Sequence, residues 1–197
     1  FSVKKGTARQ IYTLLLSSFY IKQPKQIIGV TGTNGKTSTV EFCRQLWALA
    51  GWKAASMGTL GTKTETAINK SVYKNKEENL TTFEPSDLYK KLNFLVEEKI
   101  SHLALEASSH GIDQYRLDGV NFSGAVFTNL SHDHLDYHGN TANYFSTKKR
   151  LFTKVLKNNS AISINIDDIY GKKLYEELKD NNHFIITFGQ CPKADIK

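Results

Sequence analysis

A glycine-bearing turn with an adjacent lysine and threonine is the strongest chemical signal in the sequence. The run Thr31-Gly32-Thr33-Asn34-Gly35-Lys36-Thr37-Ser38 follows a β-branched stretch and precedes a helical pattern. Glycines let a backbone approach phosphates closely, and the N–H groups at a helix start point at the anion. Lys36 would add positive charge near the β- and γ-phosphates, and the Thr37 hydroxyl would ligate Mg²⁺. The turn predicts ATP or GTP binding, although Val30 stands where the usual pattern has glycine; the alternative is a turn that only caps a helix.

Two further segments carry carboxylates and imidazoles. Glu106 ends the apolar stretch 102–105, and the stretch 132–136 packs two histidines and two aspartates into five positions. Mg²⁺ prefers oxygen ligands such as Glu106 and tolerates one imidazole. Zinc is the alternative metal, but no cysteine accompanies these segments. A histidine alone after a strand would more often be a hydrogen-bonded turn residue, and the clustering is what favours a metal site here.

Alternating strand and helix patterns surround these segments. Hydrophobic periodicity predicts strands at 26–31, 53–57, 102–106, 124–128, 161–165 and 184–187, and helices at 8–19, 36–50, 86–99, 142–157 and 169–179. Such alternation predicts a doubly wound α/β fold with a mostly parallel sheet, whose ligands bind at the carboxyl ends of the strands. The polar stretch 61–80 interrupts the pattern and is interpreted as an excursion, with a hairpin as its simplest form.

Composition restricts the class of protein. The 197 residues are 40% hydrophobic and 23% charged, as in ordinary globular domains. A net charge of +7 is spread over scattered lysines without a long basic tract, so we expect no nucleic-acid partner. No apolar stretch approaches the roughly 20 residues that span a bilayer, which predicts no membrane partner. Cys43 and Cys191 are far apart and fit a reducing cytoplasm, with Cys43 on the apolar stripe of its helix rather than acting as a nucleophile.

The motifs resemble those of the Mur ligase family, which also includes folylpolyglutamate synthase. The loop Gly32-Thr33-Asn34-Gly35-Lys36-Thr37 is similar to the family's phosphate loop, and the strings 105–111 (LEASSHG) and 128–139 (TNLSHDHLDYHG) resemble its MurE branch. The resemblance runs from about residue 21 to residue 189. It implies a cytoplasmic, monomeric, ATP- and Mg²⁺-dependent ligase in peptidoglycan synthesis. Such an enzyme joins a diamino acid, meso-diaminopimelate or L-lysine, to UDP-N-acetylmuramoyl-L-Ala-D-Glu through an acyl phosphate.

The resemblance also implies roles for particular residues near the nucleotide. ATP would be bound by Thr33, Asn34, Gly35, Lys36, Thr37, Ser38 and Thr39. Mg²⁺ would be held by Thr37 and, at a second position, by Glu106, His134 and a carbamylated Lys148. A plain lysine ammonium would repel the metal, whereas a CO₂ adduct supplies carboxylate-like oxygens. Two alternatives are that Lys149 is the modified residue and that Lys148 is an ordinary solvated helix lysine.

The dipeptide substrate would be bound by Thr81, Thr82, Ser108, Gln114 and Arg116. A guanidinium offers a fork of donors to a carboxylate or phosphate, and hydroxyl groups can orient it. Phe83 stands where the family string has proline, and Thr81-Thr82 could instead cap the following helix. Asn165, Asp167 and Asp168 resemble a family string at a strand-to-helix turn, for which the sequence indicates no role.

The family has three domains, and the chain is expected to supply one of them. Residues 1–24 would be a lead-in from a mostly missing N-terminal domain, and residues 25–197 a central ATP-binding domain, incomplete at its C-terminal end. The C-terminal domain, which would select the diamino acid, is expected to be absent and the isolated chain inactive. Two alternatives stay open: a folylpolyglutamate synthase-like ligase, which a folate-dependent ATPase signal would support, and a non-ligase phosphate-loop module, which bicarbonate-independent turnover would support.

Overall fold

The described residues form one seven-stranded sheet with helices on both faces. The computed structural model describes residues 5–64 and 80–197. The strand order is β3-β2-β4-β1-β5-β6-β7. The strands span Gln26–Thr31 (β1), Ala54–Gly58 (β2), Gly61–Thr64 (β3), His102–Glu106 (β4), Gly124–Phe127 (β5), Ala161–Asn165 (β6) and Phe184–Phe188 (β7). Every pairing is parallel except that of β2 with β3, which is an antiparallel hairpin.

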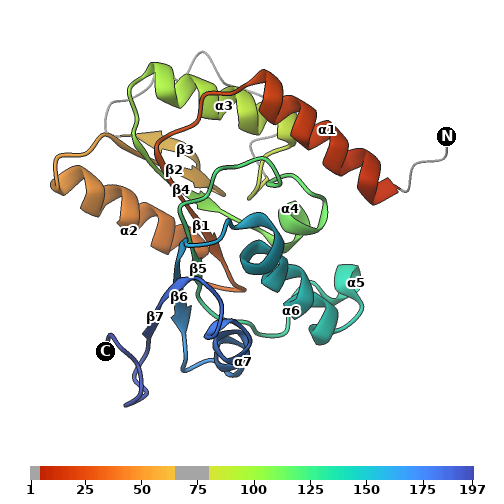
Figure 1. Cartoon of the computed structure of the whole chain (residues 1–197), viewed down its shortest axis with the longest axis vertical. Helices are drawn as coiled ribbons and strands as arrows, with labels where there is room; N and C mark the ends of the chain where they lie inside the picture. Colours follow the sequence, from red (N-terminus) through yellow and green to blue (C-terminus); the bar gives the residue numbers. More distant parts are fainter. Residues whose placement is uncertain (1–4, 65–79) are drawn as a thin grey trace.

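Helices cover the two faces unequally. They span Lys5–Phe19 (α1), Lys36–Leu49 (α2), Pro85–Glu97 (α3), Ser109–Asp113 (α4), Leu135–His138 (α5), Thr141–Arg150 (α6) and Ile169–Leu178 (α7), and α6 continues into a π-helical turn, Leu151–Val155 (η1). Figure 1 shows α2 on one side of the sheet and α3, α4, α6 and α7 on the other, with α1 beside α3. None of the described helices combines the length and apolar character needed to cross a bilayer.

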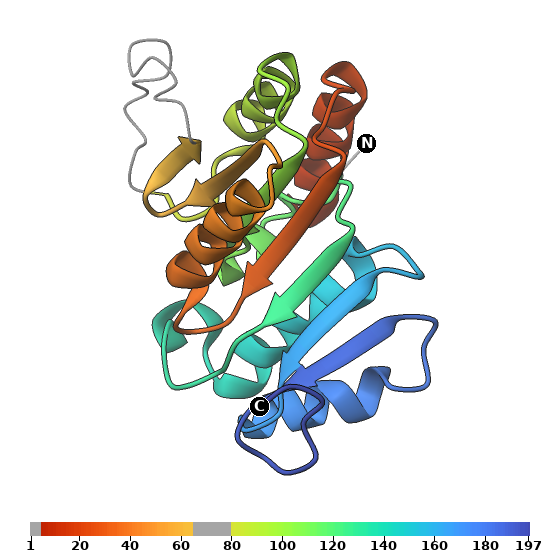
Figure 2. The same cartoon turned by 90° about the vertical axis from the view of Figure 1, so that its left-hand side faces the viewer.

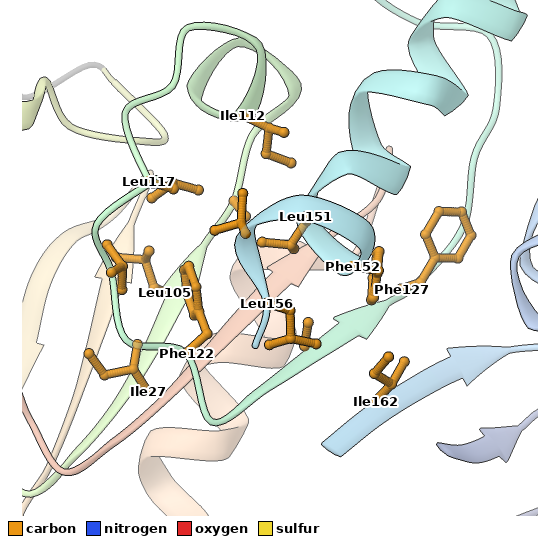
Figure 3. Packing of buried hydrophobic residues seen from close by; sticks show 14 of the residues in the cluster. Ile27, Leu105, Ile112, Leu117, Phe122, Phe127, Leu151, Phe152, Leu156 and Ile162 are labelled. Atoms are coloured by element: carbon orange, nitrogen blue, oxygen red, sulfur yellow. The ribbon is translucent and has the colours of Figure 1, made fainter. Parts of the chain in front are cut away.

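The larger core lies between the sheet and the helices α3, α6 and α7. Strand residues with buried side chains, such as Leu105 and Phe127, meet Leu151 and Phe152 from η1 (Figure 3). Burying a side chain of this size stabilises the fold by about 1.5–3 kcal/mol. A smaller cluster on the opposite face packs Val40 of α2 onto Val30 and Ala104 of the strands.

Most predicted elements are confirmed, because short β-branched stretches and helical periodicity are local signals. The predicted bounds of β1, β4 and β6 are those of the structure. Residues 61–64, the start of the expected excursion, form the strand β3 and pair with β2, whereas residues 65–79, on which a hairpin within the excursion would depend, lie outside the described residues. The short helices α4 and α5 were not predicted, since four or five residues cannot display a helical period. Cys43 packs against the smaller cluster, as its stripe predicted.

The pairing brings three predicted motifs to one edge. β1 lies between β4 and β5, and both pairings are parallel, so the segments that follow these three strands emerge side by side. In Figure 2 the arrowheads of β1 and β5 point to the same edge of the sheet. The phosphate loop follows β1, Glu106 ends β4, and the histidine-rich segment follows β5. Ligands bind at this edge in open α/β sheets.

Candidate active site

The phosphate loop is a tight turn at the start of α2. Gly35 has a left-handed backbone (φ 83°) and precedes the first helical residue, Lys36, without a side-chain cap on the helix. The first N–H groups of such a helix have no partner within it and attract anions. The Lys36 ammonium folds back and donates to the carbonyl oxygens of Gly32 (3.0 Å) and Thr33 (2.7 Å). Burial lowers the pKa of Lys36, while the nearby Glu106 and Asp133 carboxylates oppose that shift.

Lys148 is a buried lysine on the inner side of α6. Its side chain is 1% exposed, and its ammonium donates to the Gly32 carbonyl (2.8 Å) and lies 4.4 Å from the centre of the Tyr144 ring. Burial lowers its pKa well below 10.5, and the positive charge of Lys36 lowers it further. The prediction of a solvated helix lysine is wrong for Lys148. The neighbouring Lys149 is instead at the protein surface, where its ammonium pairs with the Glu177 carboxylate at 2.8 Å.

Glu106 is a buried carboxylate that is hydrogen-bonded by the residue directly after β2. It is 1% exposed, and it accepts hydrogen bonds from the backbone N–H (2.9 Å) and the hydroxyl (3.2 Å) of Thr59. A Cβ atom on Gly58 would lie 2.2 Å from the nearer carboxylate oxygen, so the carboxylate occupies space that only glycine leaves open. Thr59 was not among the predicted site residues, because it touches Glu106 only through the pairing of β2 with β4.

His134 presents its ring at the mouth of the site. It has a left-handed backbone (φ 51°) directly before α5, and its side chain is 47% exposed. The ring lies 3.5 Å from the Asp133 carboxylate and packs edge-on against His110, with ring centres 5.1 Å apart. Burial lowers the pKa of His110, and the proximity of His134 adds to that effect. Both imidazoles line the same cleft as Lys36 of the phosphate loop.

The predicted substrate residues form one hydrogen-bonded group around Thr82. The Thr82 hydroxyl donates to the Glu106 carbonyl (2.9 Å) and accepts from the Ser108 N–H and hydroxyl, both at 2.9 Å. The Arg116 guanidinium donates to the Thr82 carbonyl (2.6 Å), the Gln114 amide oxygen (2.7 Å) and the Glu84 carboxylate (2.7 Å). The alternative that Thr81-Thr82 cap α3 is wrong, since Glu84 holds that position.

A cleft of about 290 Å³ collects most of these side chains. It is lined by Lys36, Leu80, Thr81, Thr82, Ser108, Ser109, His110, Arg116, His134, Tyr144 and Lys148. Four of these residues were not predicted as site residues: Leu80, Ser109, His110 and Tyr144. Ser109 and His110 stand in the string that contains Ser108, which is the signal that could have found them. The predicted site residues that do not line the cleft are Thr33, Asn34, Gly35, Thr37, Ser38, Thr39, Glu106 and Gln114. The Glu106 backbone carbonyl accepts from Thr82, which does line it.

A Mg²⁺ ion at Glu106 and His134 would gain oxygen ligands if Lys148 were modified. In the part of the chain that the structure describes, no three His, Cys, Asp or Glu side chains gather as metal ligands. Glu106 and His134 thus need a further donor. The buried Lys148 ammonium donates to the same carbonyl as Lys36, which places two cations together in a buried site. A carbamate would remove this repulsion and add the missing oxygen ligands, so the residues fit the ion in that form.

Strand order, loop and cleft together define a class of protein: a phosphate-loop domain of the doubly wound α/β type, with a polar cleft beside the loop. Residues 30–197 match the family model of the Mur ligase middle domain, and the chain belongs to this family.

Named relatives agree with this assignment. The chain is 44% identical over 188 residues to the UDP-N-acetylmuramoyl-L-alanyl-D-glutamate–2,6-diaminopimelate ligase of Anaplasma marginale, covering 95% of the chain and 38% of the relative. The ligase of that name from Rhizobium meliloti is 41% identical over 182 residues, covering 92% and 36%. The chain spans little more than a third of these proteins.

Solved structures extend the comparison to the fold. A solved ligase of the same name matches with a TM-score of 0.78 at 32% identity, covering 95% of this chain and 38% of that one. Escherichia coli FolC, solved with DHPP and ADP, matches with a TM-score of 0.67 at 14% identity, covering 96% and 48%. The second likeness concerns the fold alone.

Proposed function

We propose that the chain is the nucleotide-binding unit of an ATP-dependent ligase that joins a diamino acid to UDP-N-acetylmuramoyl-L-alanyl-D-glutamate. The observation that carries this proposal is that Lys36, Lys148 and His134 line one cleft with Arg116 and the threonine pair. This cleft can hold a triphosphate end and a substrate carboxylate side by side. The names of the relatives favour 2,6-diaminopimelate over lysine as the added residue.

The proposed reaction has two steps. An oxygen of the D-Glu carboxylate attacks the γ-phosphorus, the bond from this phosphorus to ADP breaks, and an acyl phosphate forms. The amine of the diamino acid then attacks the acyl carbon, phosphate leaves with the former carboxylate oxygen, and the amine proton is released. Lys36 contributes by offsetting negative charge on the phosphates, because two anions must approach each other in the first step. Arg116 and Thr82 orient the dipeptide substrate.

Mg²⁺ fits this scheme as a second group that offsets phosphate charge. Thr37 would ligate it beside the phosphate loop, and Glu106, His134 and carbamylated Lys148 would hold the second ion. Carbamate formation requires a neutral amine, whose nitrogen attacks CO₂ and then loses a proton. The lowered pKa of Lys148 makes that neutral amine easier to form.

We propose that this unit is one of three domains of the full-length enzyme. Residues 1–24 would lead in from an N-terminal domain and residues 25–197 would form the central domain of a monomeric, cytoplasmic enzyme. The diamino acid would be selected by a C-terminal domain. The isolated chain is accordingly expected to bind nucleotide weakly and not to ligate.

The decisive experiment uses the full-length enzyme with ATP, Mg²⁺, UDP-muramoyl dipeptide and diaminopimelate. Product and ADP should form together, and both should be lost in Lys36→Ala. Lys148→Ala should also lose activity, whereas Lys149→Ala, its surface neighbour, should not. Wild-type activity should rise with added bicarbonate. Product formation unchanged in Lys36→Ala would end the proposal; ADP release that depends on a folate instead would support the synthase-like alternative.

A further inference from the structure

The segment after β5 closes over the phosphate loop through Asn129. The Thr33 N–H donates to the Asn129 carbonyl (2.9 Å). The Asn34 N–H donates to the Asn129 side-chain oxygen (2.9 Å), and the side-chain nitrogen donates to the Asn34 carbonyl (3.2 Å). Both polar atoms of the Asn129 side chain are thus used on the backbone of one loop residue. This contact requires no particular side chain at position 34.

Residues 128–131, which we name the clasp, fit the loop closely at other points as well. The Thr128 hydroxyl donates to the Asn34 carbonyl (2.7 Å), and the Ser131 N–H donates to the Thr33 hydroxyl (3.0 Å). A Cβ atom on Gly32 would lie 1.9 Å from the Thr128 hydroxyl and 3.0 Å from the Asn129 carbonyl oxygen. Glycine at position 32 is therefore needed for the clasp to approach.

The turn between β6 and α7 supports the clasp from its other side. The Asn165 side chain donates to the Thr128 carbonyl (2.8 Å), and the Leu130 N–H donates to the Asp168 carboxylate (3.1 Å). The other Asp168 oxygen accepts from the first N–H groups of α7. Asn165 and Asp168, for which the sequence indicates no role, thus bind the backbone of the residues on either side of Asn129.

The clasp determines which loop N–H groups remain for a ligand. Those of Thr33 and Asn34 are engaged by Asn129, whereas the first turn of α2 has no side-chain cap. We propose that Asn129 is a positioning residue, which holds the Asn34 peptide so that the N–H groups from Gly35 onward face the phosphates of the nucleotide. The inference rests on the proposed nucleotide binding at this loop. A loop ordered before binding loses less conformational entropy when the ligand arrives.

The test measures nucleotide binding by the full-length enzyme. Asn129→Ala removes two hydrogen bonds and should raise the Kd for Mg·ADP and the KM for ATP roughly 30-fold, which equals about 2 kcal/mol at 1.4 kcal/mol per tenfold. The KM for the UDP-dipeptide and kcat at saturating ATP should change by less than about threefold. Asn165→Ala removes one support of the clasp and should act in the same direction by about fivefold. Asn121→Ala is the control, because that side chain accepts from Lys157 (2.8 Å) and precedes β5, whereas Asn129 follows this strand.

Each outcome decides the matter. An unchanged Kd for Mg·ADP in Asn129→Ala overturns the inference, as does a fall in kcat with Kd and KM for ATP unchanged. Equal losses of affinity for nucleotide and UDP-dipeptide would indicate general unfolding and also overturn it. If Asn129→Ala does not fold, an Asn165→Ala variant with wild-type nucleotide affinity refutes the inference. Failure of the wild type to bind Mg·ADP would instead refute the proposed function.

Discussion

Gly58→Ala should displace the Glu106 carboxylate without changing its chemistry. A Cβ atom at position 58 would lie 2.2 Å from the nearer carboxylate oxygen and 2.4 Å from the Cδ and Cγ atoms of Glu106. Ordinary contact begins near 3.4 Å, so the Glu106 side chain must move by about 1 Å and lose its hydrogen bonds from Thr59. A misplacement of about 1 Å can lower turnover roughly 100-fold, which corresponds to about 2.7 kcal/mol.

The assay is ADP release by the full-length enzyme, with thermal unfolding measured in parallel. Gly61→Ala is the matched control: Gly61 pairs with Gly58 across the hairpin, and its added Cβ would meet no atom within 4 Å. Its left-handed backbone (φ 76°) makes alanine cost about 1–2 kcal/mol of stability there. Gly58→Ala should therefore lose turnover and Gly61→Ala mainly stability. The reasoning fails if Gly58→Ala keeps turnover within threefold of wild type, or if both variants lose turnover equally.

Three further predictions concern Lys148, Arg116 and Asp168. Lys148→Met should raise the free energy of unfolding by about 1–3 kcal/mol at pH 7. Because the folded pKa of Lys148 lies well below 10.5, the unfolded chain binds more protons between those two values. Wild-type stability should therefore rise with pH in that window, and the advantage of the variant should shrink towards pH 10.5 in urea titrations; a constant difference would contradict the burial argument. Arg116→Lys loses the guanidinium group that donates to both Thr82 and Gln114. Initial rates should show a KM for the UDP-dipeptide about tenfold higher, with little change in the KM for ATP. Asp168→Ala removes the cap of α7 and should cost about 1–2 kcal/mol, seen as a melting temperature lower by a few degrees; an unchanged value would show that the cap is replaced by solvent.

Local chemistry made the phosphate loop and most of the sheet predictable from the sequence. A glycine turn with Lys36 between a β-branched stretch and a helix has few interpretations, and the strand at 26–31 was found with its observed bounds. The strings around Glu106 and His134 predict further site residues by resemblance. Such signals survive in a single sequence because turn chemistry and periodicity involve neighbouring residues only.

Tertiary structure alone decided how the site is held. Whether Lys148 or Lys149 points inward depends on which face of α6 meets the phosphate loop, and the burial of Lys148 settles that choice. Thr59 reaches Glu106, and Asn129 reaches Asn34, because β2, β4, β1 and β5 are neighbours in the sheet. These contacts join residues 47 and 95 positions apart, and no local pattern encodes which strands will pair.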